Sequence, residues 1–233
     1  IPIFSLLEWW AINKANKVNL VSKGFRGYFE SRYPHQNFSY FTNGIDDEFI
    51  EASQRKLNKD SSDKPIKVLY AGNIGEGQGL HTIIPELAKR MQNRVLFIII
   101  GDGGRKSELQ AAIDKVGCNN VELLDPVNRS ELIGVYLEAD VLFLHLNDYE
   151  AFQKVLPSKL FEYGAMNKPI LAGISGYSKE FVKSEISNCA VFSPGNPEEG
   201  IKKIESLRFS MKPRTEFIKK FDMEAVLDQT GNS

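Results

Sequence analysis

The chain has 233 residues, of which 42% are hydrophobic and 25% charged, values typical of soluble globular proteins. With a formal net charge of −1, the chain has no strong positive field that would favour nucleic acid as its main partner. The two cysteines, Cys118 and Cys189, are too few for a disulfide framework. With three histidines we expect no metal cluster, and no run reaches the roughly 18 apolar residues of a membrane helix. Because no signal peptide is evident either, we expect a cytoplasmic protein.

The first part of the chain predicts a small helical and extended unit. Its expected helices span 4–17 and 24–33, and its strand-like runs span 19–22 and 38–41. These elements cannot bury both of their faces within themselves. We therefore interpret residues 1–48 as the tail of an N-terminal domain. Trp9 and Trp10 are interpreted as core or interdomain contacts, with a bilayer interface as the alternative.

Beyond a polar, proline-ended linker at 49–65, strands and helices alternate along the chain. Expected strands span 67–71, 95–100, 121–124, 141–146, 170–172 and 190–192, and expected helices 80–92, 106–116, 130–139, 158–168 and 179–186. Pro85 is tolerated if the first turn of its helix begins near Thr82. This alternation predicts an α/β fold with a doubly wound parallel sheet, a Rossmann-like domain over residues 66–212.

Two glycine-rich loops follow the first two strands of this domain. In such sheets ligands bind outside the carboxyl ends of the strands. Glycines recur through the loop from Gly72 to Gly79 and again from Gly101 to Gly104. They let a ligand approach the backbone closely. The first loop does not match the G-x-G-x-x-G dinucleotide pattern, and Asp-Gly turns are common connectors, but together the loops favour a nucleotide or sugar-phosphate site.

A third feature is the stretch from Lys154 to Pro169, which predicts a helix opening at the carboxyl end of a strand. Ser158 is its expected N-cap. The positive end of such a helix suits an anion, and Glu162, one turn on, suits the hydroxyls of an attached ribose. The alternative is an ordinary capped helix with a surface glutamate.

Four runs carry a resemblance to a known family: Gly72–Leu80, 98–110, 125–144 and 157–171. They resemble the nucleotide-binding C-terminal half of a GT-B glycosyltransferase, with the closest similarity to family 4 retaining enzymes. Within that family they are similar to bacterial transferases of N-acetylfucosamine-type sugars. Residues 213–233 resemble the helix that crosses back to the N-terminal domain.

The resemblance implies a retaining transfer from a UDP-sugar to a saccharide acceptor, lipid-linked, in O-antigen or capsule synthesis at the inner membrane, where peripheral contact is expected. The implied diphosphate contacts are Gly72, Asn73, Ile74 and Gly75, with backbone amides at the helix start from Pro157, Ser158, Lys159 and Leu160. The implied nucleotide contacts are Gly101, Asp102, Gly103 and Gly104, with Val127 at the base edge and Glu162 on the ribose.

The sequence departs from the family pattern at three positions. Asn73 and Gln78 stand where the family commonly has an arginine and a lysine, and Lys154 replaces the first of its paired glutamates. A leaving diphosphate gathers negative charge, so other cations must replace them. We predict that Lys159, and after it Lys154, takes this role, with Arg105 in reserve; the alternative is that both lysines are solvated.

The GT-B fold commonly works without a metal, so we expect metal independence and no further cofactor. Beyond the strand at 141–146, Asp148 and Glu150 are candidates for the donor-sugar pocket, while His145 is interpreted as a core histidine. Two other functions remain open. One is an enzyme similar to UDP-N-acetylglucosamine 2-epimerase, and the other is a nucleotide-binding module without catalysis.

Overall fold

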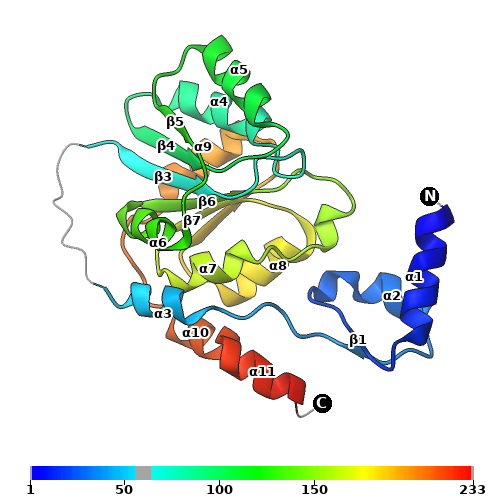
Figure 1. Cartoon of the computed structure of the whole chain (residues 1–233). Coiled ribbons are helices and arrows are strands. Elements are labelled where there is room, and N and C mark those ends of the chain that lie inside the picture. Colours follow the sequence, from blue (N-terminus) through cyan, green and yellow to red (C-terminus); the bar gives the residue numbers. More distant parts are fainter. Residues whose placement is uncertain (1, 56–63, 232–233) are drawn as a thin grey trace.

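The computed structural model describes residues 2–55 and 64–231. A small N-terminal unit stands beside a larger α/β unit, and an extended segment joins them (Figure 1). The small unit holds α1 (Pro2–Lys14), β1 (Val18–Asn19), the 3-10 helix η1 (Lys23–Phe25), α2 (Arg26–Arg32) and β2 (Phe38–Ser39). Its two short strands pair in parallel, Val18 opposite Phe38.

The larger unit is built on a six-stranded sheet with strand order β5-β4-β3-β6-β7-β8. The strands are β3 (Ile66–Ala71), β4 (Val95–Ile100), β5 (Val121–Leu124), β6 (Val141–His145), β7 (Ile170–Gly173) and β8 (Cys189–Phe192). All neighbours pair in parallel, so the doubly wound parallel sheet is confirmed. The strand order reverses between β3 and β6, which opens a crevice at their carboxyl ends.

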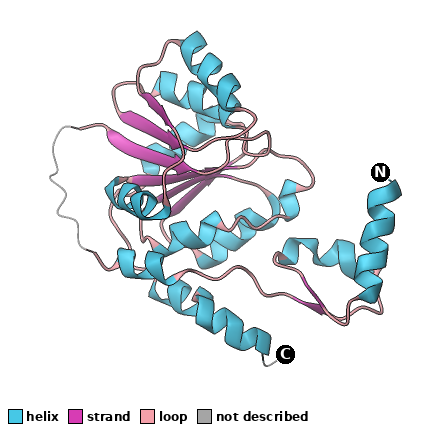
Figure 2. Ribbon diagram, viewed as in Figure 1, coloured by secondary structure: helices cyan, strands magenta, loops and turns pink. Residues whose placement is uncertain are grey.

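Helices cover both faces of this sheet (Figure 2). One face carries α4 (Leu80–Arg90), α5 (Lys106–Val116) and α9 (Pro197–Ser206). The other carries α3 (Asp47–Ser53), α6 (Arg129–Glu138), α7 (Lys159–Ala165), α8 (Gly176–Glu185) and α10 (Thr215–Phe221). The 3-10 helix η2 (Phe152–Lys154) precedes α7, and α11 (Met223–Gly231) ends the described chain. The core therefore forms two layers, one on each side of apolar strands.

Several expected helix boundaries shift for local reasons. The helix α4 begins at Leu80, as expected, and ends at Arg90, two residues before the expected end; Pro85 lies inside it and removes one backbone donor. The helix α6 begins one residue earlier than expected, because Asn128 caps it in a reciprocal capping box with Glu131. The helix α9, which the sequence analysis did not assign, is capped by Asn196.

The predicted linker at 49–65 is wrong in its first part, which is helix α3. Phe49 and Ala52 of this helix are 2% and 0% exposed. Phe49 stacks on Tyr136 of α6 with ring centroids 5.9 Å apart. This packing orders a segment whose polar composition predicted a linker. Residues 56–63 of that linker lie outside the described part of the chain.

Two contacts tie the small unit and the C-terminal helices to the α/β unit. Ser22 Oγ donates a hydrogen bond to the carbonyl of Lys154 in η2 at 2.5 Å. Farther on, Ile45 forms a bridge with Asp222, between α10 and α11. The expected single C-terminal helix over 213–233 is thus two helices with a break at Asp222. This break lets the backbone of Ile45 pair with the chain on both sides of it.

No helix within residues 2–55 and 64–231 is long and apolar enough to cross a bilayer. Both cysteines are free thiols. Burial raises the pKa of the Cys189 thiol to about 12, so this side chain acts as a small apolar group at neutral pH.

Candidate functional site

A cleft of about 330 Å³ opens at the carboxyl ends of β3 and β4. This is the edge of the sheet where α/β proteins bind ligands. The cleft combines loop backbone with one cationic side chain. Its lining consists of Ala71, Gly72, Asn73, Ile100, Gly101, Asp102, Pro126, Val127, Leu132 and Lys159.

The floor of the cleft requires glycine at two places. Gly72 and Gly101 have φ values of +153° and +152°, which side chains rarely adopt. A Cβ at Gly101 would also lie 1.8 Å from the carbonyl oxygen of Gly72. The loops after β3 and β4 therefore begin with the same backbone φ, and they pack directly against each other at Gly72 and Gly101. The backbone N–H groups of both glycines are used within the sheet, that of Gly72 on the Ile100 carbonyl at 2.9 Å and that of Gly101 on the Leu124 carbonyl at 3.1 Å.

Asn73 and Gln78 bond to each other across the first glycine loop. Asn73 Nδ2 donates to Gln78 Oε1 at 2.9 Å, and the same oxygen accepts the Gly75 N–H at 3.2 Å. The buried Tyr70 hydroxyl holds the Asn73 carbonyl at 2.6 Å. The loop is thus braced by neutral amides, and these two positions supply no positive charge.

Lys159 supplies a positive charge at the cleft. Its Nζ donates to Glu162 Oε2 at 3.1 Å and to the Tyr136 hydroxyl at 3.2 Å, and the hydroxyl donates to the same carboxylate oxygen at 2.9 Å. The stem of Lys159 passes beside Gly72, since a Cβ there would lie 3.5 Å from Lys159 Cε. Lys159, the predicted diphosphate contact, and Glu162, the predicted ribose contact, thus lie in one hydrogen-bonded cluster.

The start of α7 differs from the prediction. Ser158 occupies the predicted N-cap position, but it has helical backbone angles and makes no side-chain cap bond, so the expected capping hydrogen bond is wrong. Its carbonyl accepts the Phe161 N–H, and the Leu160 N–H donates to the Pro157 carbonyl at 3.1 Å. That bond occupies one of the amides expected to face the diphosphate.

The other predicted cations lie elsewhere. Lys154 pairs with Glu150 at 2.9 Å and is not among the residues lining the cleft. Arg105 pairs with Glu76 at 2.7 Å and also contacts Glu108. Of the three predicted cations, the structure brings only Lys159 to the cleft.

The remaining loop residues brace the cleft from behind. Ile74 is fully buried, and its N–H donates to the Asp102 carbonyl at 2.7 Å. Asp102 Oδ1 accepts the Gly103 N–H at 2.8 Å, while Gly104 is exposed. The bond from Ile74 to Asp102 joins the second glycine loop to the first.

His145 is the core histidine that the sequence predicts. It is 0% exposed; its Nε2 accepts the Gly195 N–H at 3.0 Å, so its Nδ1 carries the proton and donates to the Gln78 carbonyl at 2.6 Å. Burial lowers the pKa of His145 to about 4. Asp148 accepts from Ser175 Oγ at 2.6 Å. Neither residue is among those that line the cleft.

Sequence reasoning missed part of the cleft. The unassigned lining residues are Ala71, Ile100, Pro126 and Leu132. The first two end their strands, a signal that was present in the sequence. Tyr136 contacts Lys159 from 23 residues away, and no local pattern indicates that pairing.

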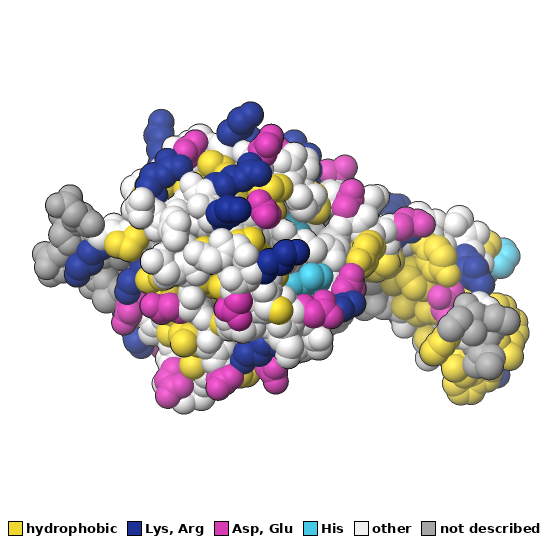
Figure 3. All heavy atoms as spheres, turned by 90° about the horizontal axis from the view of Figure 1, so that it is seen from above, with side chains coloured by type: hydrophobic (Ala, Val, Ile, Leu, Met, Phe, Trp, Pro, Cys, Tyr) yellow, Lys and Arg dark blue, Asp and Glu magenta, His cyan; other side chains and the backbone are white. Residues whose placement is uncertain are grey.

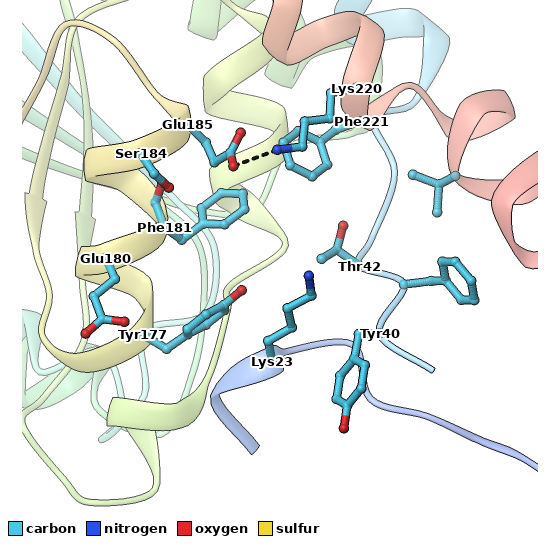
Figure 4. A pocket seen from close by; sticks show the side chains of 12 residues that line it. Lys23, Tyr40, Thr42, Tyr177, Glu180, Phe181, Ser184, Glu185, Lys220 and Phe221 are labelled. Carbon is cyan, nitrogen blue, oxygen red and sulfur yellow. Dashed lines mark hydrogen bonds and ion pairs between the residues drawn. The ribbon is translucent and has the colours of Figure 1, made fainter. Parts of the chain in front are cut away.

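A second groove of about 450 Å³ lies between the small unit, α8 and the C-terminal helices (Figure 4). Lys23 and Thr42 face Tyr177 across it, and Lys220 pairs with Glu185 at its far end at 2.7 Å. Hydroxyl groups and aromatic rings line its walls, together with charged side chains.

Apolar side chains also gather on the small unit, at the right of Figure 3. In α1, five large apolar side chains are more than half exposed: Phe4, Leu6, Leu7, Trp9 and Trp10. This face has no cover within the described chain.

Within residues 2–55 and 64–231, no group of three or more histidine, cysteine or carboxylate side chains is placed to hold a metal ion. The site therefore consists of a backbone-rich cleft with one lysine–glutamate pair at its wall.

Comparison with known proteins decides the family. The model of the family described as "Glycosyl transferases group 1" matches residues 50–221, well over half of the chain. The chain belongs to the group 1 glycosyl transferases. It is also 32% identical over 117 residues to WcaI of Escherichia coli (strain K12), a glycosyl transferase assigned to colanic acid biosynthesis. That match covers 50% of this chain and 28% of WcaI.

Solved structures share this group 1 fold. A glycosyltransferase from Rickettsia africae superposes with a TM-score of 0.74 at 16% identity, covering 93% of this chain and 62% of that one. HepE of Anabaena, in complex with UDP-glucose, has a TM-score of 0.74 at 18% identity, covering 95% and 64%. The chain thus spans less than two thirds of the length of these relatives.

Proposed function

We propose that this group 1 glycosyl transferase binds a UDP-sugar in the cleft at the ends of β3 and β4 and transfers the sugar, with retention, to a saccharide acceptor. The observation that carries the proposal is the position of Lys159 and Glu162. The lysine stem runs beside Gly72 at the cleft wall, and its ammonium pairs with the carboxylate. A nucleoside diphosphate needs a cation for its phosphates and an acceptor for its ribose hydroxyls.

In the proposed mechanism, one cation stabilises the negative charge that develops on the leaving diphosphate. As the glycosidic bond breaks, negative charge collects on the diphosphate, and a preorganised cation lowers that barrier. Asn73 and Gln78 are neutral and bond to each other. We assign the cationic role to the Lys159 ammonium, acting without a metal, with the first glycine loop beside it.

The amide pair also favours a second function. A loop braced by Asn73 and Gln78 can still present backbone to a nucleotide, but it lacks the two charges that the family commonly uses. A nucleotide-binding module without transfer activity is therefore the second candidate. Both candidates bind UDP, and only the transferase releases sugar from its donor.

The acceptor is proposed to approach from the side of the small unit. The groove between Tyr40 and Tyr177 offers aromatic rings and hydroxyls suited to a saccharide. For a lipid-linked acceptor of O-antigen or capsule synthesis, the exposed Trp9 and Trp10 would meet the inner membrane surface, because tryptophan favours that interface. WcaI, assigned to colanic acid synthesis, supports a surface polysaccharide.

The test is calorimetric titration of this chain with UDP, GDP and dTDP at low salt, with and without magnesium. We expect UDP to bind alone and independently of magnesium. Lys159→Ala should weaken UDP binding roughly 10- to 100-fold, because a hydrogen bond to a charged group contributes about 1.5–3 kcal/mol. Glu162→Gln should weaken both UDP and uridine, because the carboxylate is assigned to the ribose.

Lys89→Ala is the matched control, since Lys89 is an exposed lysine at the end of α4. Equal UDP affinity in the Lys159→Ala and Lys89→Ala variants would contradict the assignment of the cation. Failure of every nucleotide to bind would contradict the donor site itself. Donor hydrolysis by the whole protein separates transferase from module, and release of a 2-epimer would identify an epimerase instead.

A further inference from the structure

Tyr136 places a buried hydroxyl beside the two charged groups of the cleft. Its side chain is 0% exposed, yet its oxygen lies 2.9 Å from Glu162 Oε2 and 3.2 Å from Lys159 Nζ. The hydroxyl donates its single proton to the carboxylate and accepts one from the ammonium. With the 3.1 Å ion pair these bonds close a three-membered ring of contacts.

Two aromatic neighbours fix the ring of Tyr136. Phe49 of α3 stacks on one side, with centroids 5.9 Å apart, and Tyr163 of α7 meets it edge to face at 5.4 Å. Lys159 and Glu162, by contrast, have side chains 22% and 26% exposed. An ion pair three residues apart on a helix is weak and mobile by itself. A rigid third partner removes that freedom.

These bonds leave hydrogen-bonding groups of Lys159 and Glu162 free for a ligand. Both side-chain contacts to Glu162 end on Oε2, so Oε1 has no hydrogen-bond partner within residues 2–55 and 64–231. The Lys159 ammonium uses two of its three protons on Tyr136 and Glu162. One carboxylate oxygen and one ammonium proton therefore remain available.

We propose that Tyr136 is a positioning residue of the donor site, whose hydroxyl holds the Lys159 ammonium and the Glu162 carboxylate at the spacing that a nucleoside diphosphate requires. This inference rests on the proposed function for the identity of the ligand. The geometry of the three groups stands independently of it. Tyr136 acts through Lys159 and Glu162 and need not touch the donor.

The test compares Tyr136→Phe with Tyr163→Phe. Each substitution removes one buried hydroxyl from the same cluster and keeps the ring. The Tyr163 hydroxyl makes no hydrogen bond to Lys159 or Glu162, which makes it the matched control. The first readout is acylation of Lys159 by a water-soluble succinimidyl ester, followed residue by residue with mass spectrometry.

We expect Tyr136→Phe to speed acylation of Lys159 several-fold, because the ammonium loses a fixed partner, and to leave the exposed Lys89 and Lys115 unchanged. Tyr163→Phe should leave all three rates as in the wild type. Unchanged acylation of Lys159 in Tyr136→Phe would overturn the proposal. This readout needs no nucleotide, so it remains decisive if UDP fails to bind.

The second readout is calorimetry with UDP and with uridine. Tyr136→Phe should weaken UDP binding about tenfold, the effect expected of one hydrogen bond in a charged cluster, whereas Tyr163→Phe should not. If both variants bound UDP with the affinity of the wild type, the positioning role would be rejected and the donor site would stand.

A measurement on the wild-type chain guards against a variant that does not fold. Nuclear magnetic resonance should detect the Tyr136 hydroxyl proton in slow exchange with water and close in space to the ε-methylene of Lys159. A hydroxyl proton in fast exchange, with no such contact, would also overturn the proposal.

Discussion

His145 illustrates how a single buried side chain links the glycine loop to a distant turn. The imidazole accepts from Gly195 and donates to Gln78, so only its neutral form satisfies both bonds. Burial lowers the pKa of His145 to about 4, below the ordinary value of 6.5. The neutral form is thus favoured in the folded chain, and folding loses stability as this group becomes protonated.

This shift predicts a pH dependence of unfolding. The contribution of His145 is fully present above pH 6.5 and is lost as the pH falls from 6.5 towards 4. At about 1.4 kcal/mol for each pH unit the loss is at most about 3 kcal/mol. Urea unfolding at stepped pH should show it in the wild type and a smaller loss in His145→Gln. The exposed His35→Gln is the control; an identical pH profile in His145→Gln and wild type would contradict the assignment.

At the scale of single residues, the sequence predicts the glycines of the cleft and Lys159 but not the partners of Lys159. The backbone freedom of glycine and the positive charge of lysine follow from the residue type alone. The Tyr136 contact spans 23 residues and depends on how α6 packs on α7. Ser158 stands at the N-cap position without a capping hydrogen bond, because the chain enters α7 already in helical conformation.

At the scale of elements, α7 is held from below by α10. Gly164 lies against the ring of Phe217, where a Cβ would approach within 2.2 Å. The last turn of α7 therefore packs closely on the ring of Phe217 in α10.

This contact predicts opposite effects for two helical glycines. Gly164→Ala should destabilise the fold by about 1–3 kcal/mol, because the ring of Phe217 must move. Gly134→Ala in α6 meets nothing within 4 Å and should stabilise by about 0.5–1 kcal/mol through helix propensity. Chemical denaturation measures both. Equal shifts in the two variants would show that the α7–α10 contact is looser than described.

Arg214 ties the carboxyl end of α7 to the loop before β8. It is 4% exposed, and its guanidinium donates to the carbonyls of Ser187 and Lys168 at 2.8 Å each and of Gly164 at 3.2 Å. Burial lowers the pKa of Arg214 to about 10, which leaves it charged at neutral pH. Without it each of these carbonyls would lose its bond to the guanidinium.

Arg214→Met should therefore cost about 3–5 kcal/mol, because three carbonyls each lose a hydrogen bond whose loss costs about 1–3 kcal/mol. Arg214→Lys restores the charge but not the planar fork and should recover only part of the loss. Arg208→Met, at an exposed arginine, provides the reference. A loss below 1 kcal/mol for Arg214→Met would mean that water replaces the guanidinium.

Helices and strands were predicted correctly where apolar residues form a continuous run, and they were missed where only a few residues of the element are buried. The apolar run of β4 predicts a buried strand without help from its surroundings. In α3 only Phe49 and Ala52 are buried among polar residues, so the sequence around them predicts a linker. For α9, by contrast, Asn196 and Pro197 gave a helix-start signal that was not used.

At the scale of the whole molecule, the small unit docks on η2 through backbone. A Cβ at Gly24 would lie 2.4 Å from the Lys154 carbonyl oxygen, next to the Ser22 bond. Close approach at this point sets the spacing between the two units.

Gly24→Ala should therefore separate the units and enlarge the molecule without unfolding the sheet. Small-angle X-ray scattering should report a larger radius of gyration for this variant. Gly27→Ala, one turn farther on, meets nothing within 4 Å and should scatter as the wild type does. Indistinguishable scattering from the two variants would show that the docking tolerates the extra methyl group.

The position of the two tryptophans has a practical consequence. Trp9 and Trp10 are the only tryptophans in the sequence, and both lie exposed on α1. Intrinsic fluorescence excited at the indole therefore reports on this one helix and is blind to melting of the sheet. A blue shift on adding vesicles, acceptor or a further part of the protein would identify what covers α1, with no label attached.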